Sequence, residues 1–195
     1  MYQYSKKAPL PNLHASGESN KLIFKTPTEE AIVILSEEGM IELVEHHDLI
    51  NHKKNIIPAK DVHHIVVGSG NWQRDVYHFL LPSNEPHLQL RLGLTVHRGE
   101  GTWSSLPHDF ENHLENGFEE VFFYLLKGTT QRAIQVGKGV WEDGSPVDDI
   151  WPIKDRVFGA VPMGYHPVVG EPGVNVSYVW AYLAKKKSWE KVKHD

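Results

Sequence analysis

The sequence predicts an all-β protein, and three patterns carry this prediction. Short runs rich in Val, Ile, Phe and Tyr recur along the chain between Gly, Pro, Asp and Asn, as in a β-sandwich or barrel. No segment has a long apolar repeat of helical period. The run HLQLRLGLTVH alternates almost strictly, so we expect a half-buried strand with leucines on one face and Gln89 and Arg91 on the other.

The other elements follow from the same signals. Residues 1–20 are polar and contain two prolines, which is typical of an N-terminal arm. KLIFK predicts a short strand, and EAIVILSEEGMIELVEH predicts two strands divided at Gly39, with a helix as the weaker alternative. Further strands are expected in HHIVVGSGNWQRDVYHFLLP, EEVFFYLLK, TQRAIQVGKGVW, DRVFGAVP and NVSYVWAYLA, before the basic tail KKKSWEKVKHD.

Composition excludes several classes of function. The net charge is −5 and there is no basic patch, so we expect no nucleic-acid partner. The chain has no cysteine, which excludes disulfides, thiolate metal sites and a cysteine nucleophile. No apolar run approaches the length of a membrane span, and the first residues lack the apolar core of a secretory signal. We therefore expect a cytoplasmic protein without a membrane partner.

The thirteen histidines raise the prospect of a metal site. A metal in a β-barrel without cysteine would need two or three imidazoles and a carboxylate, with one position open for substrate. The pairs His46/His47 and His63/His64 do not fit this role, because adjacent strand residues face opposite ways. We interpret both pairs as solvated.

Several motifs in the second part of the chain carry a family resemblance. They are GSGNWQRDV, GTWSSLPH, FEEVFFY, TTQRA, VPMGYHPVVGEPG and VSYVWA, in that order between residues 68 and 184. With these motifs the chain resembles the cupin family of 5-deoxy-glucuronate isomerases of bacterial inositol catabolism. The resemblance implies a cupin jelly-roll barrel over residues 68–185. Residues 21–67 are few for a second barrel half, so we expect them to form a reduced N-terminal β lobe. It would follow an N-terminal arm, residues 1–20, and a basic C-terminal tail, residues 186–195, would follow the barrel.

The resemblance also implies a divalent metal, held by two neighbouring histidines, a glutamate and a later histidine. His166 in GYHPV matches the last ligand, Glu120 the glutamate, and His108 the first histidine. The sequence departs from the family pattern at Phe110, which stands where the second histidine is expected. His113 or Glu111 could replace that ligand, or the site has three protein ligands. Mixed nitrogen and oxygen ligation suits Zn, Mn, Fe or Ni.

The implied reaction is the aldose–ketose isomerisation of a sugar acid. The candidates for the catalytic base are Glu119, Glu111 and His113. Gln131, Arg132 and Tyr165 are the candidate substrate-binding residues, since the planar guanidinium of an arginine binds a carboxylate well. Two alternatives stay open, namely a non-catalytic cupin that binds a sugar acid and an Fe(II) oxygenase of the cupin class.

A homo-oligomer is also expected. A shortened lobe would leave strand edges and apolar surface in need of cover, for example at residues 32–35.

Overall fold

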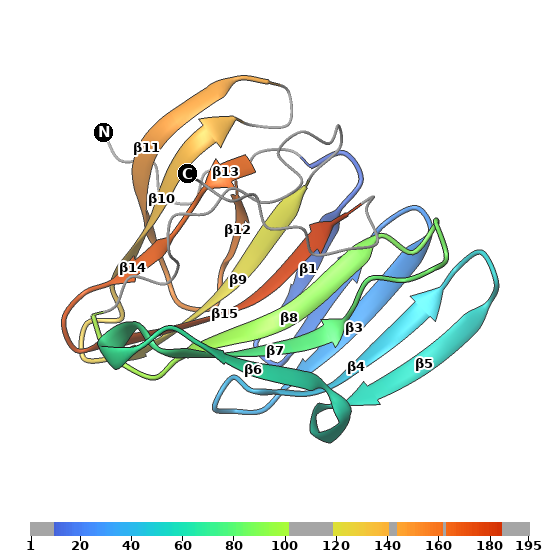
Figure 1. The fold of residues 1–195 in the computed structure, drawn as a ribbon, viewed down its shortest axis with the longest axis horizontal. Coiled ribbons are helices and arrows are strands. Elements are labelled where there is room, and N and C mark those ends of the chain that lie inside the picture. Colours follow the sequence, from blue (N-terminus) through green and yellow to red (C-terminus); the bar gives the residue numbers. More distant parts are fainter. Residues whose placement is uncertain (1–9, 102–118, 141–143, 162, 185–195) are drawn as a thin grey trace.

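A computed structural model describes residues 10–101, 119–140, 144–161 and 163–184. Fifteen strands and two single-turn 3₁₀-helices make up the regular structure of these ranges, which confirms the predicted all-β class. All strand pairs in them are antiparallel, and they form three sheets (Figure 1). None of the described helices is long and apolar enough to cross a membrane.

The first sheet, here called the lobe sheet, is a meander in which each strand pairs with the next along the chain. Its strands are β1 (His14–Glu18), β2 (Lys21–Lys25), β3 (Glu29–Leu35), β4 (Ile41–Asp48) and β5 (Lys53–Pro58). The predicted break at Gly39 is confirmed, since it lies in the turn between β3 and β4 with a φ of 81°, a conformation that glycine adopts readily.

The second sheet, the central sheet, has six strands in the order β12-β9-β15-β8-β7-β6. In chain order they are β6 (His63–Val67), β7 (Arg74–Leu80), β8 (Leu90–His97), β9 (Glu120–Gly128), β12 (Phe158–Val161) and β15 (Val174–Leu183). The third sheet contains β10 (Ala133–Val140), β11 (Pro146–Ile153), β13 (Met163–Tyr165) and β14 (Val168–Gly170). The 3₁₀-helices are η1 (Ala59–Asp61) and η2 (Gly70–Trp72).

Strands β8, β9 and β15 of the central sheet are almost entirely buried. One face of these strands packs against the lobe sheet, and the other face of β9 and β15 packs against the third sheet (Figure 1). Val121, Phe123 and Leu125 belong to the core on the lobe side, whereas Phe122, Tyr124 and Leu126 belong to the core on the barrel side. The continuous apolar run VFFYLL is explained by this arrangement, because a strand covered on both faces needs no polar face.

Two sequence-based expectations about burial were wrong for the same reason. The alternation of β8 is correct, but the strand is not half-buried: Arg91, on the face opposite the leucines, is only 3% exposed because the barrel side is covered too. Residues 32–35 alternate between buried and half-buried, and Val33 and Leu35 are already covered within the chain by the core on the lobe side. Oligomerisation therefore stays a prediction without this support.

The solvated interpretation of the histidine pairs holds for His63 and His64, which are exposed, but fails for His46. His46 is 6% exposed, and its Nε2 lies 2.9 Å from Oε2 of Glu29, which is itself 1% exposed.

The division into arm, lobe, barrel and tail stays a prediction. Strand β1 begins at His14 inside the expected arm, and β6, inside the expected lobe, pairs with β7 in the central sheet.

Glu29 joins the lobe sheet to the start of β8. Its Oε1 accepts hydrogen bonds from the backbone N–H groups of Gln89 at 2.6 Å and Leu90 at 2.8 Å, while Oε2 faces His46. Charge-assisted hydrogen bonds of this kind are stronger than neutral ones. A second link comes from Arg156, which donates to the carbonyl oxygens of Ser19 and Glu37.

We expect Glu29→Gln to lower the free energy of unfolding by about 2–3 kcal/mol, because three contacts of a buried carboxylate lose their ionic character. Glu30→Gln is the matched control, since Glu30 lies next to it on the opposite face in partly exposed pairs with Lys25 and His47. The control should change stability by less than about 0.5 kcal/mol. Urea unfolding measures both, and equal effects would contradict the role of Glu29.

Candidate functional site

The candidate site lies at the start of β9, where the side chains of two adjacent glutamates point to opposite faces of the sheet. Glu119 and Glu120 are each 1% exposed, although charged side chains are seldom so buried without a partner. Successive side chains alternate between the faces of a strand, so Glu119 points to the lobe side and Glu120 to the barrel side. The two carboxylates consequently have different partners and different roles.

Glu119 binds the segment that leads into β1. Its carboxylate accepts hydrogen bonds from the backbone N–H groups of Asn12 and Leu13 and from the side-chain amide of Asn12, at 2.6 to 3.1 Å. The backbone of Glu119 also accepts a hydrogen bond from the N–H of Leu183, at the end of β15. These contacts favour an anchoring role for Glu119 over the role of catalytic base.

Glu120 faces His166 inside the barrel. Oε2 of Glu120 lies 3.2 Å from Nε2 of His166, and both side chains are 2% exposed. The imidazole packs edge-on against Phe122 with ring centres 5.8 Å apart, and Phe122 in turn stacks on Tyr178 at 4.4 Å. The aromatic neighbours hold the imidazole beside the carboxylate in a dry environment, where electrostatic interactions are strong.

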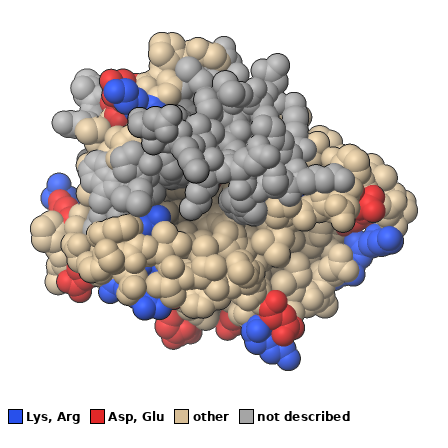
Figure 2. All heavy atoms as spheres, in the orientation of Figure 1, with Lys and Arg blue, Asp and Glu red and all other residues tan. Residues whose placement is uncertain are grey.

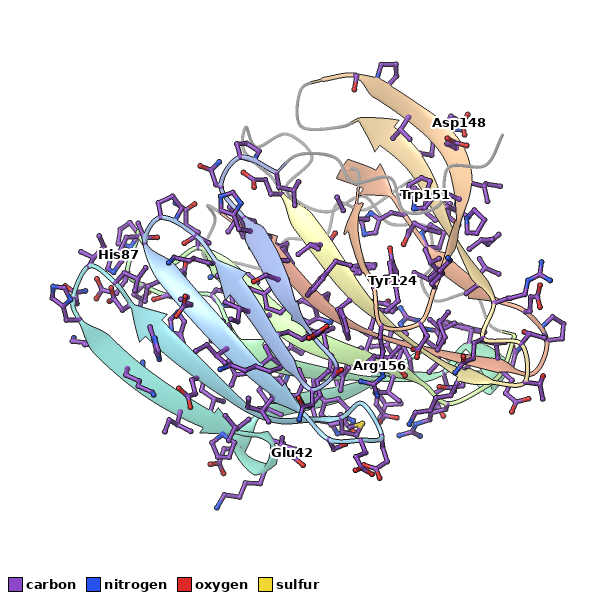
Figure 3. All side chains as sticks on the ribbon, turned by 180° about the vertical axis from the view of Figure 1, so that it is seen from behind. Glu42, His87, Tyr124, Asp148, Trp151 and Arg156 are labelled. Carbon is purple, nitrogen blue, oxygen red and sulfur yellow. The ribbon has the colours of Figure 1, made fainter. Side chains whose placement is uncertain are left out.

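A buried amide fixes the backbone at His166. The Nε2 group of Gln135, on β10, donates to the carbonyl oxygens of His166 at 2.5 Å and of Pro167 at 3.0 Å. Its Oε1 accepts a hydrogen bond of 3.0 Å from the hydroxyl of Tyr124. Burial raises the pKa of Tyr124, so this hydroxyl stays protonated and serves as a donor. Figure 3 shows Tyr124 with Trp151 between the central and third sheets.

No pattern in the sequence singles out Tyr124 or Gln135. Tyr124 stands in the apolar run of β9, and a lone amide in AIQVG is also what an exposed strand position contains. Both became recognisable only when the register of β10 against β13 and β14 was known.

The carboxylate of Glu120 and the imidazole of His166 provide ligand atoms that suit a cation. The 3.2 Å contact of Oε2 of Glu120 with Nε2 of His166 does not have the geometry of a hydrogen bond, and this buried oxygen has no hydrogen-bond partner among the described residues. A carboxylate in that position is costly unless something compensates its charge. Imidazole nitrogen and carboxylate oxygen are ligands that divalent transition metals accept. Within the described ranges, no third His, Asp or Glu comes close enough to complete a metal site with them.

The other site residues predicted from the sequence lie in different parts of the chain. His108, Glu111 and His113, together with Phe110, lie outside the described residues. Tyr165 ends β13, pairs with Lys138 of β10 and is half-buried directly before His166.

Gln131 and Arg132 lie far from Glu120, in the connection from β9 to β10. Glu120 begins β9, whereas the amide of Gln131 donates to the carbonyl oxygen of Leu126, six residues further along that strand. At about 3.3 Å per residue, the two positions are roughly 20 Å apart. Both residues are exposed, and the Arg132 side chain is paired with Glu171 at 3.1 Å. Their placement does not support a substrate-binding role.

The charged residues on one face of the molecule do not indicate a further site. On the face shown in Figure 2, Lys and Arg alternate with Asp and Glu among the described residues, and neither sign gathers into a patch.

The model of the KduI/IolB family matches residues 17–195. The chain belongs to the KduI/IolB family. The resemblance in the motifs is thereby confirmed, and the family match covers the lobe as well as the barrel.

Curated relatives of the chain are named 5-deoxy-glucuronate isomerase. The protein of Geobacillus kaustophilus is 31% identical over 140 residues, which are 69% of this chain and 49% of the relative. That of Lacticaseibacillus casei is 22% identical over 181 residues, 91% of this chain and 58% of the relative. The chain thus spans about half the length of the curated relatives it matches.

A solved structure supports the fold. The IolB-like protein of Salmonella typhimurium LT2 superposes with a TM-score of 0.62 at 17% identity, over 95% of this chain and 77% of that protein. The predicted cupin architecture is consistent with this likeness.

His78, on the barrel face of β7, has a lowered pKa. The ring of His78 packs 5.4 Å from Trp180 and 5.6 Å from His63, and burial, reinforced by His63, lowers its pKa to about 4. The unfolded chain takes up this proton near pH 6.5 and the folded chain only near 4, so His78 removes stability as pH falls through that window.

Because solvent partly screens His78, we expect it to account for about 1–2 kcal/mol of stability lost between pH 7 and pH 4.5. His78→Gln should remove that part of the pH dependence, as measured by urea unfolding at the two pH values. An imidazole resonance of His78 that titrates near pH 6.5 would contradict the prediction.

Proposed function

We propose that this chain is a metal-dependent aldose–ketose isomerase of a sugar acid, similar to 5-deoxy-glucuronate isomerase. The observation that carries the proposal is the buried pair Glu120–His166 in a chain of the KduI/IolB family. The same family relation supports a place in inositol catabolism and in the cytoplasm. A small-molecule sugar acid is the proposed partner, and a homo-oligomer is part of the proposal.

The metal would be held by Glu120, His166 and His108, with His113 or Glu111 as a possible fourth ligand. A bound divalent ion supplies Lewis-acid chemistry, which stabilises negative charge on the substrate oxygens when a proton leaves carbon. The protein residues then have three tasks. The aromatic wall of Phe122 and Tyr178 excludes water, the Gln135 amide fixes the backbone at His166, and a base transfers the proton between adjacent carbons.

The directions of the two glutamates reduce the number of candidates for the catalytic base. Glu119 faces the lobe and is saturated by hydrogen bonds from Asn12 and Leu13, so we propose that it positions the segment before β1. The candidates that then remain for the base are Glu111 and His113. In the reaction the base takes the proton from the carbon next to the aldehyde and returns it to the aldehyde carbon, while the hydroxyl proton passes to the former carbonyl oxygen.

Metal content separates the roles of the paired glutamates. Protein purified without an affinity tag should contain close to one divalent metal per chain, and His166→Ala and Glu120→Gln should each lose most of it. Glu119→Gln is the matched neighbour; it should keep the metal while losing about 1–3 kcal/mol of stability. Elemental analysis with circular dichroism decides this, and an unchanged metal content in His166→Ala would remove that residue from the site.

Activity provides the direct test. The metal-loaded protein should convert 5-deoxy-glucuronate to its ketose, followed by NMR, and treatment with a chelator should abolish the conversion until metal is restored. No conversion by protein that contains metal would refute the isomerase proposal.

A non-catalytic sugar-acid binder is the alternative that Phe110 favours, because it stands where the family pattern has a metal-binding histidine. Such a protein would bind the sugar acid without metal and without turnover. Oxygen uptake that depends on the sugar acid would instead indicate the third possibility, an Fe(II) oxygenase.

A further inference from the structure

A cavity of about 290 Å³ lies between the lobe sheet and strands β7 and β8 of the central sheet. Most of its wall is apolar and includes Phe79 and Leu80, which belong to the core on the lobe side. Glu29, His46 and Arg91 are its ionisable lining residues. Because the central sheet separates this cavity from the barrel side, a ligand bound here would be distinct from one at the proposed metal site.

The wall of the cavity is fastened to the lobe. Part of it comes from residues 81–83 and Leu88, in the connection between β7 and β8. In that connection, Nε2 of His87 lies 3.0 Å from Oδ2 of the buried Asp48, and the hydroxyl of Thr28 donates to the carbonyl oxygen of His87 at 2.7 Å. These contacts hold the wall in place without a ligand, so binding would cost little ordering of the chain.

Arg91 contributes guanidinium donors that lack a partner. Its Nη1 donates to the carbonyl oxygens of Leu88 at 3.2 Å and Leu90 at 3.1 Å. Among the described residues, Nε and Nη2 have no acceptor, and no carboxylate lies within ion-pair distance. Burial lowers the pKa of Arg91, which reflects the cost of keeping this cation away from water. The edge formed by Nε and Nη2 is a pair of parallel donors, which suits the two oxygens of a carboxylate.

Glu29 lines the same cavity but cannot serve Arg91 in this way. Its Oε1 accepts hydrogen bonds from the backbone N–H groups of Gln89 and Leu90, and its Oε2 lies 2.9 Å from Nε2 of His46. Both oxygens are thus engaged, and these donors compensate part of the negative charge. A polar sugar would lose hydrogen bonds against the apolar wall, and a cationic ligand would meet the guanidinium. An apolar molecule with one anionic group suits the cavity better.

We propose that this cavity is a second binding site, which takes a small carboxylate with an apolar body. The carboxylate would lie against Nε and Nη2 of Arg91, and the body would lie among Phe79, Leu80 and their apolar neighbours. A cavity of about 150 Å³ binds benzene, so this one has room for roughly ten non-hydrogen atoms. The site is independent of the proposed isomerase, and its ligand would bridge the lobe and the central sheet.

The test compares hexanoate with 1-hexanol, which has the same chain length and no charge. Affinities are measured on the full chain by calorimetry or ligand-observed NMR. Wild-type protein should bind hexanoate about tenfold or more tightly than hexanol. Arg91→Gln should weaken hexanoate binding about tenfold, since a charged contact is lost, and should leave hexanol binding within about twofold. Arg132→Gln is the matched control and should behave as wild type, because its side chain is exposed and paired with Glu171.

Arg91→Lys covers the case in which Arg91→Gln does not fold. It keeps the charge but loses the two parallel donors, so hexanoate should bind several-fold more weakly than to wild type while hexanol binding is unchanged. Three results would overturn the proposal: equal affinity of wild-type protein for the two ligands, a preference for hexanoate that survives in folded Arg91→Gln, or an equal loss for both ligands in that variant.

The metal site is separated by a further variant, because a carboxylate could also bind to a metal ion. Glu120→Gln should bind hexanoate as wild type does, and an excess of glucuronate should not displace hexanoate from either protein. Loss of hexanoate binding in Glu120→Gln, or displacement by glucuronate, would assign the carboxylate to the metal site and refute the second site. Turnover of 5-deoxy-glucuronate is a separate measurement, so either proposal can fail while the other stands.

Discussion

The burial of strands β8, β9 and β15 on both faces is the constraint on which the rest of this structure depends. Nearly every residue of these strands lies in a buried environment on one side of the sheet or the other, and the period of two along a strand decides which one. Leu90, Leu92 and Val121 belong to the core shared with the lobe, and Phe122 and Trp180 to the core shared with the third sheet. The position of each polar residue in these strands therefore also decides which side of the sheet its side chain faces.

Buried charges in this protein have two kinds of environment. Glu29 and Glu119 are saturated by backbone N–H donors from segments distant in sequence, so they fix those segments and leave little capacity for a ligand. Glu120 is as deeply buried as they are, but its Oε2 has no hydrogen-bond partner in the described part of the chain. This difference in hydrogen-bond saturation, more than burial itself, separates structural from functional candidates.

Much of the fold could be predicted from the sequence, because strand runs and turn residues are local signals. The motifs also led to His166 and Glu120, which the structure brings within 3.2 Å. The predictions that were wrong depended on which sheet covers which face of a strand. Arg91 was expected on an open face and His46 in solvent, yet both are covered by elements far away in the sequence. The substrate-binding role of Arg132 stays a prediction, and the order of the strands shows that this residue follows the end of β9 opposite to Glu120.

The shared central sheet also determines which part of this chain can exist on its own. Residues 68–184 contain the barrel motifs, but their leucine-bearing face on β8 is completed by Phe24, Val33 and Val44 of the lobe. A shortened protein restricted to the barrel would present that face as a wide apolar surface, which favours aggregation over an independent fold. The lobe is thus an integral layer of the architecture, because its sheet covers a face of the barrel that would otherwise meet water.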